Sequence, residues 1–207
     1  MHLQRNGCSW TLVTRKIVMY RYFIIFVLVS FFSGCATSVK SPLSARVTGD
    51  GKYWIVQQPL KFELNGEDRF VPKGFVTDFA SVPRSFWVAF PPCDIYTPAA
   101  VVHDYLYWMQ FPECDQECAD SFLNSAMEAA DVPSWKRVPI YMAVRVAGRS
   151  AWSENSMLNR QGVIRFVPDD FVADQPNETW AQMEERLKIH LEERAVSSSG
   201  GSTVGRP

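Results

Sequence analysis

Two short stretches of this chain gather most of the polar side chains that could do chemistry. Residues 74–84 contain Asp78, Ser81 and Arg84, and residues 99–107 contain His103, Asp104 and Tyr107. Histidine changes charge near neutral pH, so His103 is a candidate general base that Asp78 or Asp104 would orient. Ser81 lacks the Gly-x-Ser-x-Gly turn that exposes a nucleophile, so it is a weaker catalytic candidate. The candidate ligand-pocket residues are Ser81, Arg84 and Tyr107.

The same side chains are also typical ligands of a divalent metal. Carboxylates together with an imidazole bind Zn²⁺ or Mn²⁺, and the candidate ligands are Asp78, His103, Asp104 and Asp120. His103 and Asp104 are neighbours on a predicted helix, where adjacent side chains point about 100° apart. They share a site only if that site lies between them.

A purely structural network is the third interpretation of the cluster. Thr77 and Asp78 suit side-chain hydrogen bonds that hold a turn. Arg84 could pair with Asp78, Asp104 or Asp120, and His103 could donate to a carbonyl group in the core. The residues alone leave the structural, metal-binding and metal-free catalytic interpretations open.

The sequence before His103 predicts strands, and the sequence after it predicts helices. Apolar and polar residues alternate from Leu60 to Leu64, the period of a half-buried strand, and Asn65-Gly66 predicts a tight hairpin. Further strands are expected at 53–57, 69–72 and 163–167, and helices at 99–110, from 112 or 115 to 130, at 135–151 and at 178–194. This order predicts an α+β fold in which about three helices pack on a small antiparallel sheet, with a peripheral C-terminal helix.

The N-terminus has the pattern of a targeting segment. An apolar run of ten residues, 23–32, follows three basic residues and precedes Ser33-Gly34-Cys35. A membrane-spanning helix needs about 20 residues, so this run is more typical of a signal peptide. It resembles a bacterial lipoprotein signal, which implies lipidation of Cys35. Ala36 after that cysteine implies sorting to the outer membrane, and Met19 is a candidate for the true start.

Composition predicts the remaining organisation of the chain. The expected segments are a signal peptide at 1–34, a lipidated cysteine and tether at 35–51, one globular domain at 52–175, a peripheral helix at 176–196 and a disordered tail at 197–207. Removing residues 1–34 takes away four of the 21 Lys and Arg residues and none of the 22 Asp and Glu residues, so the mature chain is acidic. It has no clustered basic face, which argues against a nucleic-acid partner.

Besides the lipidated Cys35, three cysteines remain in the mature chain, and an exported compartment permits disulfides. Cys114 and Cys118 are one helical turn apart, which is unfavourable for a bridge inside a regular helix. We therefore expect Cys93 to pair with Cys114 or Cys118. Zinc binding by cysteines together with His103, or burial as free thiols, are the alternatives.

Several uncommon strings follow one another in a fixed order. They are Val71-Pro-x-Gly-Phe-x-Thr-Asp-Phe-Ala-Ser-Val-Pro83, Ala99-Ala-Val-Val-His-Asp-Tyr-Leu-Tyr107 and Val132-Pro-x-Trp-Lys-Arg137. Across about residues 53–152 the chain resembles the family catalogued as domain of unknown function 1353. That family occurs in bacteria and bacteriophages and has no settled activity. The resemblance therefore bears on the boundaries of the fold and not on a reaction.

Together these features predict a lipoprotein anchored in the outer membrane with its domain facing the periplasm. The first hypothesis is a non-catalytic envelope or prophage-linked accessory or binding module. The alternative is a hydrolase that uses one divalent metal, Zn²⁺ or Mn²⁺, to act on a cell-envelope component. The expected partners are the membrane, through the lipid anchor, and an envelope polymer or envelope protein.

Overall fold

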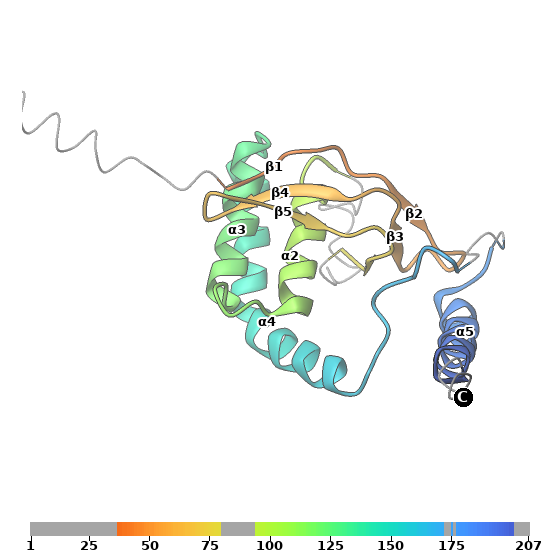
Figure 1. Cartoon of the computed structure of the whole chain (residues 1–207). Coiled ribbons are helices and arrows are strands. Elements are labelled where there is room, and N and C mark those ends of the chain that lie inside the picture. Colours follow the sequence, from red (N-terminus) through yellow and green to blue (C-terminus); the bar gives the residue numbers. More distant parts are fainter. Residues whose placement is uncertain (1–36, 80–93, 172–174, 176, 201–207) are drawn as a thin grey trace, which may run out of the picture. The chain divides into compact units, whose positions relative to one another are not determined.

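The computed structural model describes residues 37–79, 94–171, 175 and 177–200 (Figure 1). All of these residues belong to one of the two units into which the chain divides, Ala36–Pro207. The described residues form two small antiparallel sheets of three strands and four helices. The predicted α+β class is therefore confirmed.

The first sheet has the strand order β1-β4-β5 and contains the predicted hairpin. It consists of β1 (Ser38–Val39), β4 (Leu60–Leu64) and β5 (Glu67–Val71). Leu64 pairs with Glu67, so only Asn65 and Gly66 form the turn. Both turn residues have positive φ angles, 54° and 82°, as a two-residue hairpin turn of this kind requires. The alternating side chains of β4 place Leu60, Phe62 and Leu64 in the core.

The second sheet has the order β2-β3-β6 and leads directly to the polar cluster. It consists of β2 (Ala45–Val47), β3 (Trp54–Val56) and β6 (Val76–Thr77). Strands β1 and β2 lie inside residues 35–51, a range in which the sequence predicted a tether. They are two and three residues long and have no clear apolar alternation, so only their backbone pairing with β4 and β3 identifies them as strands.

Two helices lie beside the first sheet, a third packs against these two, and a fourth follows later in the chain (Figure 1). They are α2 (Thr97–Met109), α3 (Gln116–Ala129), α4 (Ser134–Arg160) and α5 (Trp180–Gly200). Asp115 caps α3 by accepting a hydrogen bond from the Cys118 N–H. Helix α4 runs nine residues beyond its predicted end, because the polar residues after Ala151 contain no helix breaker before Gly162. Helix α5 includes residues 197–200, which were predicted to be disordered.

The core consists of two groups of side chains. The larger group joins the first sheet to α2 and α3, and α2 is buried on nearly all sides. The smaller group packs Trp180, Met183 and Leu187 of α5 against Ile55 and Val76 of the second sheet. Val76 of strand β6 therefore lies in this apolar group, whereas the next two residues, Thr77 and Asp78, belong to the polar cluster. The predicted strand at 163–167 is reduced to a single bridge between Phe166 and Phe75.

Candidate functional site

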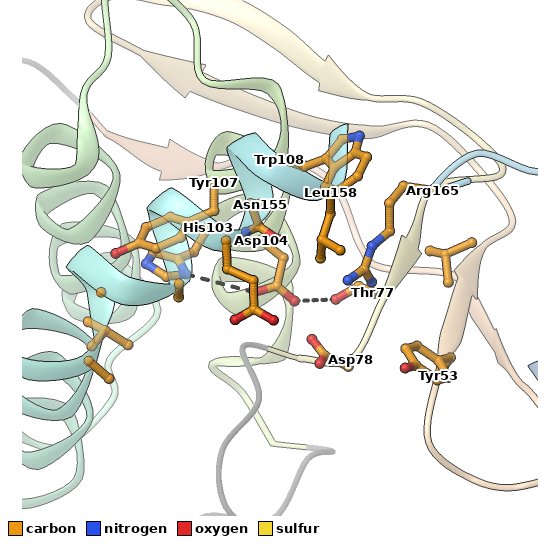
Figure 2. Close-up of a pocket in the computed structure, with 16 residues that line it drawn as sticks. Tyr53, Thr77, Asp78, His103, Asp104, Tyr107, Trp108, Asn155, Leu158 and Arg165 are labelled. Atoms are coloured by element: carbon orange, nitrogen blue, oxygen red, sulfur yellow. Dashed lines mark hydrogen bonds and ion pairs between the residues drawn. The ribbon is translucent and has the colours of Figure 1, made fainter. Parts of the chain in front are cut away.

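A pocket of about 350 Å³ lies between the end of β6, helix α2, helix α4 and the segment that carries Arg165 (Figure 2). Its polar lining includes Tyr53, Thr77, Asp78, His103, Asp104, Tyr107, Glu154, Asn155 and Arg165. Its apolar lining includes Val76, Trp108, Val144, Ala147, Ala151 and Leu158. A few polar groups on a largely preformed concave surface are typical of small-molecule sites.

The approach of two chain segments at Gly74 builds one side of the pocket. Gly74 has a φ angle of +84°, and a Cβ atom there would lie 2.1 Å from the carbonyl oxygen of Val167. The Val167 N–H donates to the Gly74 carbonyl at 2.9 Å, and the Val76 N–H donates to the Arg165 carbonyl at 2.9 Å. Only glycine permits this close contact without strain. The contact places Arg165 beside the residues that follow β6.

A chain of polar contacts runs from β6 through α2 to α3. The Thr77 hydroxyl donates to Asp104 Oδ2, and Asp104 Oδ1 lies 3.8 Å from His103 Nδ1. On the other side of the ring, His103 Nε2 lies 3.1 Å from Asp120 Oδ1. Thr77 also accepts a hydrogen bond from the Phe79 N–H at 3.0 Å, a bond of the kind that the structural interpretation of the cluster expected for this residue. The network therefore connects three separate elements, β6, α2 and α3.

Asp120 is the innermost member of this network. Its carboxylate is fully buried and accepts hydrogen bonds from the Tyr107 hydroxyl at 2.6 Å and from Gln116 Nε2 at 3.3 Å. Burial would raise the pKa of Asp120, but its hydrogen bonds with His103 and Tyr107 outweigh burial and hold that pKa below its ordinary value. Burial and the bond to Asp120 both raise the pKa of the Tyr107 hydroxyl, which stays neutral.

His103 lies between two carboxylates. Burial by itself would lower the pKa of His103, because the interior disfavours the charged ring. Asp104 and Asp120, one on each side, outweigh that effect and hold the pKa above its ordinary value. The ring also lies against Tyr107, with 4.2 Å between the ring centroids. The arrangement favours a buried imidazolium.

One atom of this histidine lacks a hydrogen bond. His103 is only 3% exposed, and Nδ1 has no hydrogen-bond partner among the described residues. Its distance of 3.8 Å from Asp104 Oδ1 is that of an ion pair and is too long for a direct hydrogen bond. Figure 2 shows this nitrogen directed toward Asp104 at the pocket.

The structure brings together four of the predicted site residues. Asp78, His103, Asp104 and Tyr107 all line the pocket. Asp120 lies behind His103 and does not line it. Ser81, Arg84, Cys93 and Cys35 lie outside the described residues. Within residues 37–79, 94–171, 175 and 177–200, no group of three or more His, Cys, Asp or Glu side chains is arranged to hold a metal ion.

Four polar pocket residues were absent from the sequence-based candidates: Tyr53, Glu154, Asn155 and Arg165. Glu154 and Asn155 lie beyond the predicted end of the third helix, so that helix appeared too short to reach the pocket. Arg165 lies across the pocket, with its guanidinium carbon 5.4 Å from the centre of the Trp108 ring. A single arginine between Ile164 and Phe166, in a predicted strand, was the available signal.

The cysteines differ from the prediction. Cys114 and Cys118 form a disulfide with a Cα–Cα distance of 5.2 Å, so the predicted pairing of Cys93 with either of them is wrong. The reason is the position of Cys114, which precedes the helix cap Asp115 and lies in a turn where its N–H donates to the Phe111 carbonyl. The two cysteines are therefore not both inside a regular helix, and their separation suits a disulfide.

Among comparisons with known proteins, a family match covers nearly the same part of the chain as the resemblance over residues 53–152, and none names an activity. Residues 54–144 match the model of a family described as "Protein of unknown function (DUF1353)". The chain is also similar to the "Uncharacterized protein y4jT" of Sinorhizobium fredii (strain NBRC 101917 / NGR234), with 34% identity over 116 residues. That alignment covers 49% of this chain and 33% of the relative, so the chain spans about a third of that protein. No solved structure matches the chain significantly.

One structural observation concerns the membrane. Among the described residues, none of the helices combines the length and the apolar character that crossing a bilayer demands.

Proposed function

We propose that this chain is a lipoprotein held to the outer membrane by a lipid on Cys35, with a non-catalytic domain that binds a small envelope component in the pocket between β6, α2 and α4. The observation that carries the binding role is the position of His103 between Asp104 and Asp120. A general base must be able to accept a proton. The two carboxylates favour the protonated ring, so His103 is better suited to hold the structure than to take a proton.

The network supports a rigid binding site. Asp120 joins α3 to α2 through His103 and Tyr107, and Asp104 joins α2 to β6 through Thr77. Side chains that are held by buried hydrogen bonds lose little freedom when a ligand binds, which favours affinity. His103 and Asp104 of this network line the pocket, whose volume of about 350 Å³ is large enough for a small molecule.

Two features support the exported location. The N-terminal segment has the basic, apolar and cysteine-terminated order of a lipoprotein signal. The Cys114–Cys118 disulfide fits an oxidising compartment, because disulfides are rare in the cytosol. Replacement Cys35→Ser tests the anchor: it should abolish labelling by radioactive fatty acid and release the protein from the membrane fraction. Labelling that persists would contradict the assignment of Cys35.

The binding role is tested by thermal unfolding in the presence of a low-mass extract of the cell envelope. The extract should raise the melting temperature of the parent protein. It should not do so for Ala151→Trp, which fills the pocket with a large ring. Ala143→Trp makes the same change on the same helix at an exposed position outside the pocket lining, and it should behave like the parent. An extract that stabilises no variant, or that stabilises all three equally, would contradict the proposed site.

A further inference from the structure

We propose that the ligand of this pocket is a neutral, polyhydroxylated molecule about the size of a mono- or disaccharide, recognised through its hydroxyl groups. This inference rests on the proposed binding role and names the class of ligand. It follows from the lining of the pocket, which combines donors on His103 and Arg165 with carboxylate acceptors.

The first contact is the gap between His103 and Asp104. His103 Nδ1 is buried and has no hydrogen-bond partner among the described residues, while Asp104 Oδ1 lies 3.8 Å away. A buried polar atom without a partner carries a free-energy cost, so a ligand that satisfies it gains affinity. A hydroxyl group suits this position because it accepts one hydrogen bond and donates another. It would accept from the ring N–H and donate to the carboxylate.

The second contact is the guanidinium group of Arg165 on the other side of the pocket. Among the described residues, Arg165 has no carboxylate within ion-pair distance, and its place is set by the Trp108 ring and by the backbone bond from Val76. Figure 2 shows the guanidinium directed toward the end of β6, where Thr77 and Asp78 lie. Arginine has several N–H donors and no acceptor, so it would donate to ligand oxygens.

The balance of charge favours a neutral ligand over an ion. Asp78, Asp104 and Glu154 line the same space as Arg165 and the His103 ring. An anion is attracted by Arg165 but repelled by the three carboxylates, and a cation is attracted by the carboxylates but repelled by Arg165, so either charge meets a repulsive penalty in this pocket. Hydroxyl groups avoid both penalties, because each can donate to a carboxylate and accept from a cationic N–H. Ala147, Ala151 and Leu158 offer an apolar surface for the C–H face of a sugar ring.

The direct test is isothermal titration of the purified protein with glucose, galactose and N-acetylglucosamine, each beside glucuronate, glucosamine and cyclohexanol. At least one neutral sugar should bind, and its charged or hydroxyl-poor counterpart should bind at least about tenfold more weakly. Arg165→Gln should weaken sugar binding about tenfold. The matched control Arg160→Gln, which removes a guanidinium bonded to Ser156 outside the pocket, should leave affinity within about twofold.

A second measurement does not depend on any variant that might fold poorly. In ¹⁵N-histidine-labelled protein, the bound sugar should shift the Nδ1 resonance of His103, while His190 on α5 stays unchanged and serves as the internal control. Absence of a shift, or binding only of the charged counterparts, overturns the sugar proposal. If the envelope extract stabilises the parent and not Ala151→Trp while no sugar binds, the ligand class is wrong and the binding role stands. If the extract also fails, the binding role falls as well.

Discussion

Replacement of His103 by alanine is the perturbation that most directly tests the network. The substitution leaves the Asp120 carboxylate fully buried and takes away the nearer of its two ion-pair partners, at 3.1 Å. Breaking a buried ion pair by removal of one partner costs about 3–5 kcal/mol, because the remaining charge has no compensation. Asp120 keeps the Tyr107 hydroxyl and Gln116 as donors and Arg145 Nη1 at 3.9 Å as a second cation, so we expect the low end of that range. The predicted loss in the free energy of unfolding is about 3 kcal/mol.

The assay is urea unfolding at pH 7, followed by tryptophan fluorescence, for the parent, His103→Ala and His190→Ala. His190 makes the matched control, because it also contacts an aspartate, Asp170 at 3.3 Å, but at the partly exposed surface of α5. Surface pairs are worth less than about 1 kcal/mol, so His190→Ala should change little. The reasoning would be refuted if His103→Ala lost no more stability than His190→Ala. Such a result would favour an active-site role, in which strained polar residues often contribute little to stability.

Three further predictions follow from the same geometry. Because the pKa of folded His103 is raised above its unfolded value of 6.5, its stabilisation is fully present below pH 6.5 and is lost as the pH rises through the folded pKa. The unfolding free energy should therefore fall above pH 6.5 in the parent, and a parent profile that matches that of His103→Ala would contradict the ion-pair assignment. Gly148→Ala would place a Cβ atom 2.4 Å from the Tyr107 hydroxyl, so we expect a loss of about 1–2 kcal/mol as the Tyr107–Asp120 bond is displaced. Chemical unfolding can check this. In a Tyr107→Phe background the cost should fall but not vanish, because the Cβ atom would still lie 2.5 Å from Gln116 Nε2; an unchanged cost would show that the displaced Tyr107–Asp120 bond contributes nothing to it. Elemental analysis and thermal unfolding with Zn²⁺ or Mn²⁺ test the metal prediction made for Asp78, His103, Asp104 and Asp120. Since Asp120 is already bonded to His103, Tyr107 and Gln116, we expect neither stoichiometric metal nor stabilisation, and one bound metal per chain would revive the hydrolase alternative.

Local patterns in the chain were sufficient for most of the helices and strands. The alternation in β4, the Asn65-Gly66 turn and the Asp115 cap depend on residues close together in the sequence. Short strands such as β1 and β2 lack such a pattern, because their stability comes from pairing with a distant strand. The end of α4 was also misplaced, because polar residues continue a helix as readily as they end one.

The residues of the candidate site also fall into two groups, those that the sequence pointed to and those that depend on packing between distant segments. Residue types and spacing identified part of the polar lining, and they grouped Asp78, His103, Asp104 and Tyr107, which all line the pocket and lie on two short segments. Three features became visible only in the folded chain: Asp120 lies behind the histidine, Arg165 lies across the pocket and Cys114 pairs with Cys118. Each of these outcomes depends on packing between separate segments or on the direction of the chain at a helix end. No periodicity in the sequence encodes the distances between these segments, which place His103 between two carboxylates and shape the pocket.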